Sequence, residues 1–340
     1  MLRMPKSVSL SRVATSFRGG SVIAVAVAAA LQTAPLHAQT WPQRPITFIV
    51  SQPAGASPDI MARLVADRLS QILKQPVIVE NKPGGGNTVG AHAAANAAPD
   101  GTKFFFATSA SLVTNPFLMK SIPYDPIKDF VPIALIARSH QVVAVNPSLP
   151  IKSLSDLIAY DKKEPGKLSM AADGPRNISG VIALALNKRA GMSLVQVSYP
   201  NPTQGLQDVA AGHVGVGVFA VSTIDSFVRD GRLRLIADAS KDRSASFPDV
   251  PPVADTLAGF DFLGWFMVLA PAGTPAEIVA KMSSALDAVA QDAKVQELAP
   301  TLGFEISAKG LGGPDAAARY LKDQMDLWGR TTKELAIDPQ

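Results

Sequence analysis

Short apolar runs alternate with amphipathic segments along most of the chain. Ile60, Leu64, Leu69 and Leu73 recur at the spacing of one helix face. The run Ile46–Val50 before them is short and continuously apolar, as in a buried strand. Repeated alternation of this kind predicts an α/β fold with parallel sheets.

The same patterns predict the remaining strands and helices. Further strands are expected at Val77–Glu80, Phe104–Ala107, Ile133–Ala137, Val142–Val145, Leu168–Ala171, Val195–Val197, Val214–Ala220, Leu233–Ala237 and Phe262–Ala270. Helices are expected at Asp59–Leu73, Thr88–Ala97, Leu154–Tyr160, Ile178–Arg189, Thr203–Ala211, Ile224–Asp230, Pro275–Gln291 and Asp315–Glu334.

The loop between the first strand and the first helix has the composition of an anion site. Ser57 is expected to be the N-cap of the helix and Pro58 its first residue. Residues 53–56 carry almost no side chains, so their N–H groups can approach a ligand closely. The positive end of a helix favours an anion, and a carboxylate site is predicted here. The alternative is an ordinary strand-to-helix turn.

Four loops rich in Gly, Ser, Asn or Ala follow predicted strand ends, at residues 51–58, 83–87, 108–111 and 172–177. Ligands of open parallel sheets bind beyond the carboxyl ends of the strands. If the loops come from two domains, they would face each other across a cleft, which is a favoured place for small ligands.

The first 38 residues resemble a secretory signal. Four basic residues precede the apolar run at 21–31, and Ala38 is small enough to precede a cleavage site. The run is shorter than the roughly 20 residues that a membrane span needs. We therefore expect export, with residues 1–38 removed. The chain has no Cys, so neither disulfides nor a lipidated Cys are expected.

Charge and size narrow the class of protein further. The chain has 32 basic and 28 acidic residues, and residues 1–38 hold four basic residues and no acidic ones. The remainder is therefore balanced, without a basic patch, which argues against nucleic-acid binding. About 300 residues suggest two domains. Aromatic residues make up only 6%, which suits an aliphatic core of helices on strands.

No catalytic or metal-binding constellation is evident. His92, His140 and His213 are isolated, without the paired spacing of a metal site. No G-x-S-x-G motif occurs, and the loop 84–86 lacks the features of a phosphate-binding loop. Trp265 is expected to pack in the core or between domains. We therefore expect a binding protein without a cofactor or metal, and not an enzyme.

A series of motifs resembles the extracytoplasmic receptors of tripartite tricarboxylate transporters, also called Bug receptors. The resemblance covers nearly the whole chain after the leader. It rests on PAGASPDIMAR (Pro53–Arg63), QPVIVENKPGGG (Gln75–Gly86), AAPDG (Ala97–Gly101), NPFL (Asn115–Leu118), PYDPIKDFVPI (Pro123–Ile133), VNPSLPIKSLSDLI (Val145–Ile158), FPDVPPVAD (Phe247–Asp255) and LAPAGTPAEIV (Leu269–Val279).

This resemblance implies a type II periplasmic binding protein of the Venus-flytrap kind, with two doubly wound domains and two interdomain crossings. Residues 41–142 and 262–340 would form domain 1, and residues 143–261 domain 2. It implies a monomer that captures a small organic acid for membrane permease subunits. The family holds ligand carboxylates largely by backbone amides and ordered water.

Carried over by position, the ligand-binding residues are placed in both domains. Asp59 is expected to brace the helix start rather than touch an anion. The full set is Ala54, Gly55, Ala56, Ser57, Asp59, Thr108, Ser109, Ser111, Asp173, Gly174, Arg176, Asn177, Tyr199 and Ala220.

The second-domain half of the expected cleft departs from the family pattern. Gly180 stands where a His is usual, and Ala220 where an Asp is usual. Arg176 is a candidate for a bidentate grip on a second carboxylate, or else a surface Arg paired with Asp173. Asp173 is alternatively a partner for the amino group of a zwitterion.

Three functions remain open at this stage. A transport receptor is the first, a receptor that presents the ligand to a membrane sensor kinase is the second, and an exported enzyme on the same fold is the third. The ligand is open among aliphatic dicarboxylates, aromatic acids and amino acids.

Overall fold

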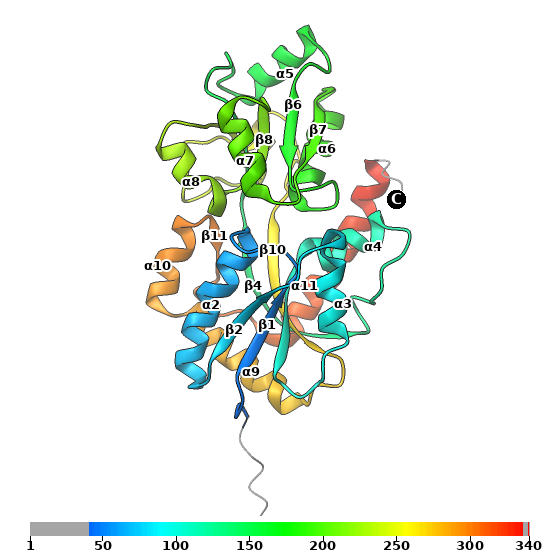
Figure 1. Cartoon of the computed structure of the whole chain (residues 1–340), viewed down its shortest axis with the longest axis vertical. Coiled ribbons are helices and arrows are strands. Elements are labelled where there is room, and N and C mark those ends of the chain that lie inside the picture. Colours follow the sequence, from blue (N-terminus) through cyan, green and yellow to red (C-terminus); the bar gives the residue numbers. More distant parts are fainter. Residues whose placement is uncertain (1–40, 336–338, 340) are drawn as a thin grey trace, which may run out of the picture. The chain divides into compact units, whose positions relative to one another are not determined.

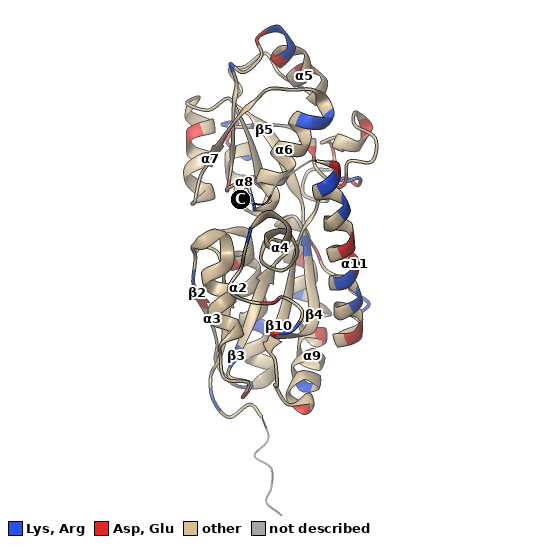
Figure 2. Ribbon diagram, turned by 90° about the vertical axis from the view of Figure 1, so that its right-hand side faces the viewer, with Lys and Arg blue, Asp and Glu red and all other residues tan. Residues whose placement is uncertain are grey.

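A computed structural model describes residues 41–335 and Pro339. The predicted signal, residues 1–38, lies outside the described residues. The described residues from Trp41 onward form one compact unit that contains two sheets (Figure 1, and Figure 2 from the side).

The first sheet has six strands in the order β11-β4-β10-β3-β1-β2. Its strands are β1 (Ile46–Val50), β2 (Val77–Asn81), β3 (Lys103–Thr108), β4 (Phe130–Ser139), β10 (Gly264–Pro271) and β11 (Phe304–Glu305). The second sheet has five strands in the order β7-β6-β8-β5-β9. These are β5 (Gln141–Val145), β6 (Ser169–Ala172), β7 (Val195–Ser198), β8 (Val216–Ala220) and β9 (Arg234–Asp238).

Helices cover both faces of the first sheet. One face packs against α2 (Ser57–Leu73), α9 (Ala276–Ala290) and α10 (Ala293–Thr301). The other packs against α3 (Thr88–Ala95), α4 (Asn115–Leu118) and α11 (Gly313–Glu334). The aromatic run in β3 contributes to the cores on both faces of the sheet. Phe104 and Phe106 point to one face and Phe105 to the other, because successive side chains of a strand alternate between faces.

The second sheet is layered in the same way. Its core toward α5 (Leu154–Lys163) and α6 (Ile178–Ala190) is continuous with one core of the first sheet. The opposite face packs against α7 (Pro202–Ala211) and α8 (Val221–Arg229). Both halves are therefore doubly wound, as predicted.

The chain changes sheet twice. It leaves the first sheet at the end of β4 and enters the second at Gln141, so His140 lies at the crossing. It returns between β9 and β10. The first change of sheet falls two residues before the predicted boundary, and the domain ranges 41–142, 143–261 and 262–340 remain a proposal.

Parallel sheets were predicted, and both sheets are mixed: they contain parallel and antiparallel pairs. Strands β1, β2 and β3 are parallel, but β10 runs antiparallel to β3 and β4, and β5 runs antiparallel to β8 and β9. Strands β5 and β10, which follow the sheet crossings, run antiparallel to both of their neighbours, and the edge strand β11, which follows α10, runs antiparallel to β4.

Candidate functional site

The loop before α2 is stabilised by its own backbone and by one carboxylate. Ala56, not Ser57, is the N-cap, and its side chain makes no capping bond. The prediction of Ser57 as N-cap and Pro58 as first helical residue was therefore wrong by one position. The Ser57 hydroxyl lies 3.2 Å from the Ser139 hydroxyl instead. The Gly55 N–H donates to Asp59 at 2.9 Å, so it does not point at an external anion.

Asp59 is buried at the start of α2 and accepts hydrogen bonds from three sides. Its oxygens receive the Gly55 N–H, the Asn81 amide at 3.0 Å and the Arg63 Nε at 3.0 Å. Burial alone would raise the pKa of Asp59, but these hydrogen bonds hold it below its ordinary value. The carboxylate therefore braces the loop, which is the expected role.

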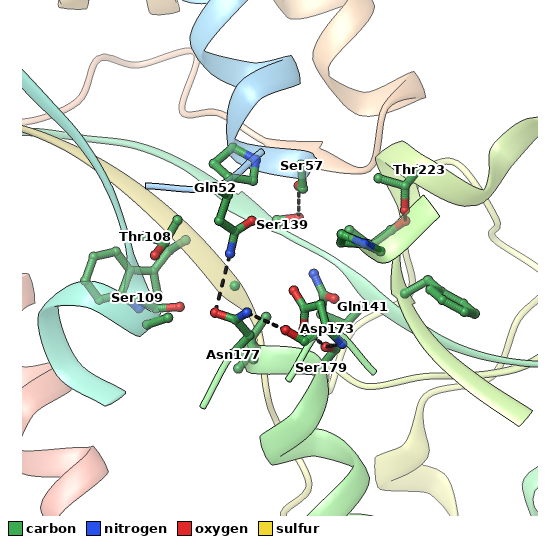
Figure 3. Close-up of a pocket in the computed structure, with 18 of the residues that line it drawn as sticks. Gln52, Ser57, Thr108, Ser109, Ser139, Gln141, Asp173, Asn177, Ser179 and Thr223 are labelled. Atoms are coloured by element: carbon green, nitrogen blue, oxygen red, sulfur yellow. Dashed lines mark hydrogen bonds between the residues drawn. The ribbon is translucent and has the colours of Figure 1, made fainter. Parts of the chain in front are cut away.

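A cavity lies where the two sheets meet (Figure 3). About 50 Å³ of it can be occupied by the centres of water-sized molecules, and the cavity is partly open to solvent. Both lobes contribute to its wall. The lining residues are Gln52, Ser57, Pro58, Thr108, Ser109, Ala110, Ser139, Gln141, Asp173, Asn177, Ile178, Ser179, Pro202, Val218, Phe219, Ala220, Thr223, Gly264, Trp265 and Phe266.

Helix N-termini from both lobes meet at this cavity. Ser57 begins α2, Asn177 is the N-cap of α6, and Ala220 is the N-cap of α8, and all three residues line the wall. The first N–H groups of a helix have no partner within the helix. Pro58 has no N–H, and the N–H groups of Asp59 and Val221 donate to the carbonyls of Ala56 and His140. The remaining N–H groups and the helix dipoles make the cavity favourable for a negative group.

The cavity wall has no Lys, Arg or His among the described residues, and Asp173 is its only charged side chain. The Asp173 N–H donates to the Ser179 hydroxyl at 3.0 Å, and that hydroxyl donates to Asp173 Oδ1. Removal of the carboxyl from water raises the pKa of Asp173 to about 7. Any electrostatic attraction for an anion must come from backbone dipoles and neutral groups.

Three amide side chains separate this cavity from an outer one. Asn177 Oδ1 accepts from the Asn87 amide at 2.6 Å and from the Gln52 amide at 3.5 Å. Asn177 belongs to the second lobe, and the other two belong to the first. The outer cavity contains Arg176, with the glycine loop 84–86 on the opposite wall. We call the Gln52, Asn87 and Asn177 side chains the amide partition.

The structure brings six of the fourteen predicted site residues to the inner cavity. They are Ser57, Thr108, Ser109, Asp173, Asn177 and Ala220. Gly174 and Arg176 line the outer cavity, so Arg176 does not pair with Asp173 across the inner one. The others line neither cavity: Ala54, Gly55, Ala56, Asp59, Ser111 and Tyr199.

The side chains of Ser111 and Tyr199 have partners elsewhere. Ser111 is fully buried and its hydroxyl donates to the Thr108 carbonyl at 2.8 Å. The Tyr199 hydroxyl donates to Asp208 at 2.7 Å. Both therefore support neighbouring loops.

Sequence reasoning missed much of the wall contributed by the sheet crossings. Ser139 and Gln141 flank His140 at the first crossing, and Gly264 follows the second. The polar triplet 139–141 between two apolar strands was the available signal. Trp265 is buried, as expected, and its indole N–H donates to Gln324 at 3.2 Å, but it also lines the cavity.

Among residues 41–335 and Pro339, no group of three or more His, Cys, Asp or Glu side chains is arranged to hold a metal ion. In that same part of the chain, no helix is both long and apolar enough to cross a membrane.

Two lobes joined by two crossings, with a dipole-lined cavity between them, define a solute-binding protein. Residues 61–337 match the family described as Tripartite tricarboxylate transporter family receptor, and the chain belongs to this family. It is similar to Protein BugT of Bordetella pertussis, with 32% identity over 92% of this chain and 96% of BugT. The predicted family is thereby confirmed, and it is a family of receptors rather than enzymes.

Solved structures agree with the assignment. R. palustris Rpa4515 with adipate is 27% identical, with a TM-score of 0.84 over 88% of this chain and 100% of that chain. MatC from Rhodopseudomonas palustris with bound malate is 27% identical, with a TM-score of 0.79 over 86% of this chain and 99% of that chain. The predicted two-domain periplasmic binding-protein fold is confirmed.

Proposed function

We propose that this protein captures a small organic acid in the inner cavity and delivers it to the membrane permease of a tripartite tricarboxylate-type secondary transporter. The observation that carries the proposal is the meeting of the N-termini of α2, α6 and α8 at a cavity with no cationic lining among the described residues. Such a wall favours a carboxylate over a cation or a neutral solute.

The remaining wall defines the shape of the ligand. Ile178, Phe219 and Trp265 give an apolar surface, while Ser109 and Gln141 offer hydrogen bonds. Small-ligand sites commonly combine an apolar wall with a few polar groups that fix orientation. A short carbon chain with a terminal carboxylate satisfies both. The adipate and malate bound by the two similar structures are of this kind.

Release would follow from hinge opening at the two crossings, because the lobes share no other covalent connection in the described chain. The protein would act in the periplasm as a monomer after loss of residues 1–38. The closed, liganded form would be the one that docks on the permease.

Titration of organic acids by calorimetry, after a thermal-shift screen, tests this function. A ligand at a hundred times its dissociation constant should stabilise the protein by about 2.7 kcal/mol. Gly264 provides the control, since an added Cβ would meet Gln141, Ile178 and Ser139 at an ordinary 3.6 Å. Gly264→Ala should keep binding, whereas Gly264→Leu should block it. Binding that survives in Gly264→Leu would place the ligand outside the inner cavity and reject the proposal.

A further inference from the structure

Asp173 is in an unexpected place for a site that favours anions. It is the only charged side chain among the described residues that line the inner cavity. An ionised carboxylate there would repel a carboxylate ligand, with no cationic side chain on the wall to offset it.

The geometry leaves one oxygen of Asp173 available. Its Oδ1 is occupied by the Ser179 hydroxyl, and Oδ2 has no hydrogen-bond partner within residues 41–335. Figure 3 shows Asp173 beside Gln141 and Ser179 in the cavity wall. Gln141 is only 4% exposed, and its amide likewise has no partner in the described part of the chain. A buried amide and a partly buried carboxyl therefore face the cavity with unused hydrogen-bonding capacity.

These unused groups complement a hydrogen-bond donor with positive charge. A carboxylate Oδ2 and the carbonyl oxygen of an amide both accept hydrogen bonds, and an ammonium group supplies three donors. The helix N-termini around the same cavity supply the donors that a carboxylate needs. The cavity therefore offers complementary surfaces to both ends of a zwitterion.

We propose that Asp173 determines specificity by binding an ammonium group, so that the inner cavity selects carboxylates that carry an amino group over the same acids without one. This inference rests on the proposed function and names its ligand class. Gln141 is the second acceptor for the ammonium group. The ligand carboxylate lies at the N-termini of α2 and α6.

The protonation of Asp173 separates this proposal from its main rival. With a pKa of about 7, the empty site holds a mixture of acid and carboxylate near neutrality. An ammonium ligand favours the carboxylate form, so its binding strengthens as pH rises. A protonated Asp173 could instead donate to a ligand carboxylate, and that binding would weaken as pH rises.

Matched ligand pairs provide the test. Adipate against 2-aminoadipate, and succinate against aspartate, differ by one amino group, and each is titrated calorimetrically into the full mature chain at pH 8. We expect the aminated member of at least one pair to bind about tenfold or more tightly, since a charge-assisted hydrogen bond supports a difference of that size. Asp173→Asn should remove this preference, because the aminated ligand loses its ionic partner, while the acid without an amino group is no longer repelled by a carboxylate and should bind more tightly.

Asp249→Asn is the matched control, because Asp249 is an exposed carboxylate of the same lobe and should leave both affinities unchanged. A pH series on the unmodified protein needs no variant: binding of the aminated ligand should strengthen about tenfold from pH 6 to pH 8 as Asp173 ionises. Equal or tighter binding of the acid without an amino group overturns the inference while leaving the proposed function intact. If no acid of either kind binds, both fail.

Discussion

The Nδ1 of His140 lies 3.0 Å from Oδ2 of Asp238, and both side chains are buried. His140 is the residue between β4 and β5, so the pair lies at a crossing between the sheets. On its other side, His140 Nε2 lies 2.8 Å from Oε1 of Glu305 in β11 of the first sheet. One imidazole thus joins a carboxylate from each lobe.

Replacing His140 should destabilise the protein strongly. His140→Gln keeps the polarity of the side chain but removes its charge, leaving the buried Asp238 carboxylate uncompensated. Breaking one partner of a buried pair costs about 3–5 kcal/mol of unfolding free energy. Urea denaturation measures this loss. In the double variant His140→Gln, Asp238→Asn, much of the loss should be recovered, and an additive loss would show that the pair is not coupled.

The same group predicts a pH dependence of stability. Burial would lower the pKa of His140, but its hydrogen bonds to Asp238 and Glu305 outweigh this and raise the pKa from 6.5 to about 9. The folded state therefore binds the proton more tightly. The stabilisation is complete below pH 6.5 and is lost as pH rises toward 9.

The other charged groups near His140 do not remove this pH dependence of stability. Arg138 and Lys241 act on Glu305, whose pKa lies below its ordinary value chiefly because of the hydrogen bond from His140. Glu305 therefore stays ionised throughout the window. The free energy of unfolding of the native chain should fall between pH 6.5 and about 9, and that of His140→Gln should stay nearly constant. If the unfolding free energies of the two proteins fall equally with pH, the pH dependence does not come from His140.

Asp59 should matter for stability through the loop that it braces. Asp59→Ala removes the acceptor of three hydrogen bonds and leaves the Gly55 N–H without one. We expect a loss of about 2–3 kcal/mol, because hydrogen bonds to a charged group contribute more than neutral ones. Arg63→Ala is the control, since Arg63 is half exposed and should cost under about 1 kcal/mol. If urea denaturation shows the same loss of unfolding free energy for both variants, the contribution of Asp59 comes from its ion pair with Arg63.

The amide partition should control how long a ligand stays bound. Asn177→Ala removes the acceptor that holds Asn87 and Gln52 of the opposite lobe. Losing one to two such bonds should speed ligand dissociation about tenfold, with a smaller change in the association rate. Stopped-flow displacement measures both rates. If only the association rate changes, the amide partition does not retain the ligand.

Arg176 tests whether a ligand reaches beyond the partition. Its guanidinium lies in the outer cavity, so only a long ligand would meet it. Arg176→Ala should then weaken a long dicarboxylate about tenfold and a monocarboxylate much less. Arg176→Lys keeps the charge but loses the planar fork, and should give an intermediate affinity for the dicarboxylate. If both ligands lose the same affinity, Arg176 does not bind a second carboxylate.

Local signals in the sequence predicted most of the fold. The strand–loop–helix around residues 46–73 follows from apolar periodicity and loop composition. The helix α10 was missed, although Asp292 accepts from the first N–H groups of the helix as a regular N-cap does. Pro300 near its end hid the helical pattern.

The parts of the site that were missed depend on long-range contacts. Ser57 looked like an N-cap because nothing local revealed its partner Ser139, 82 residues away. Arg176 looked like a clamp because the sequence does not show that Asn177, one residue later, separates the two cavities. Loop composition located the site, but which side chain turns inward depends on how the lobes meet.

The inner cavity has no lysine or arginine on the described part of its wall, and this bears on where such a receptor can work. Attraction between exposed ions fades when dissolved salt screens it, whereas enclosed dipoles are screened much less. Capture by helix ends should therefore change little between low and high ionic strength.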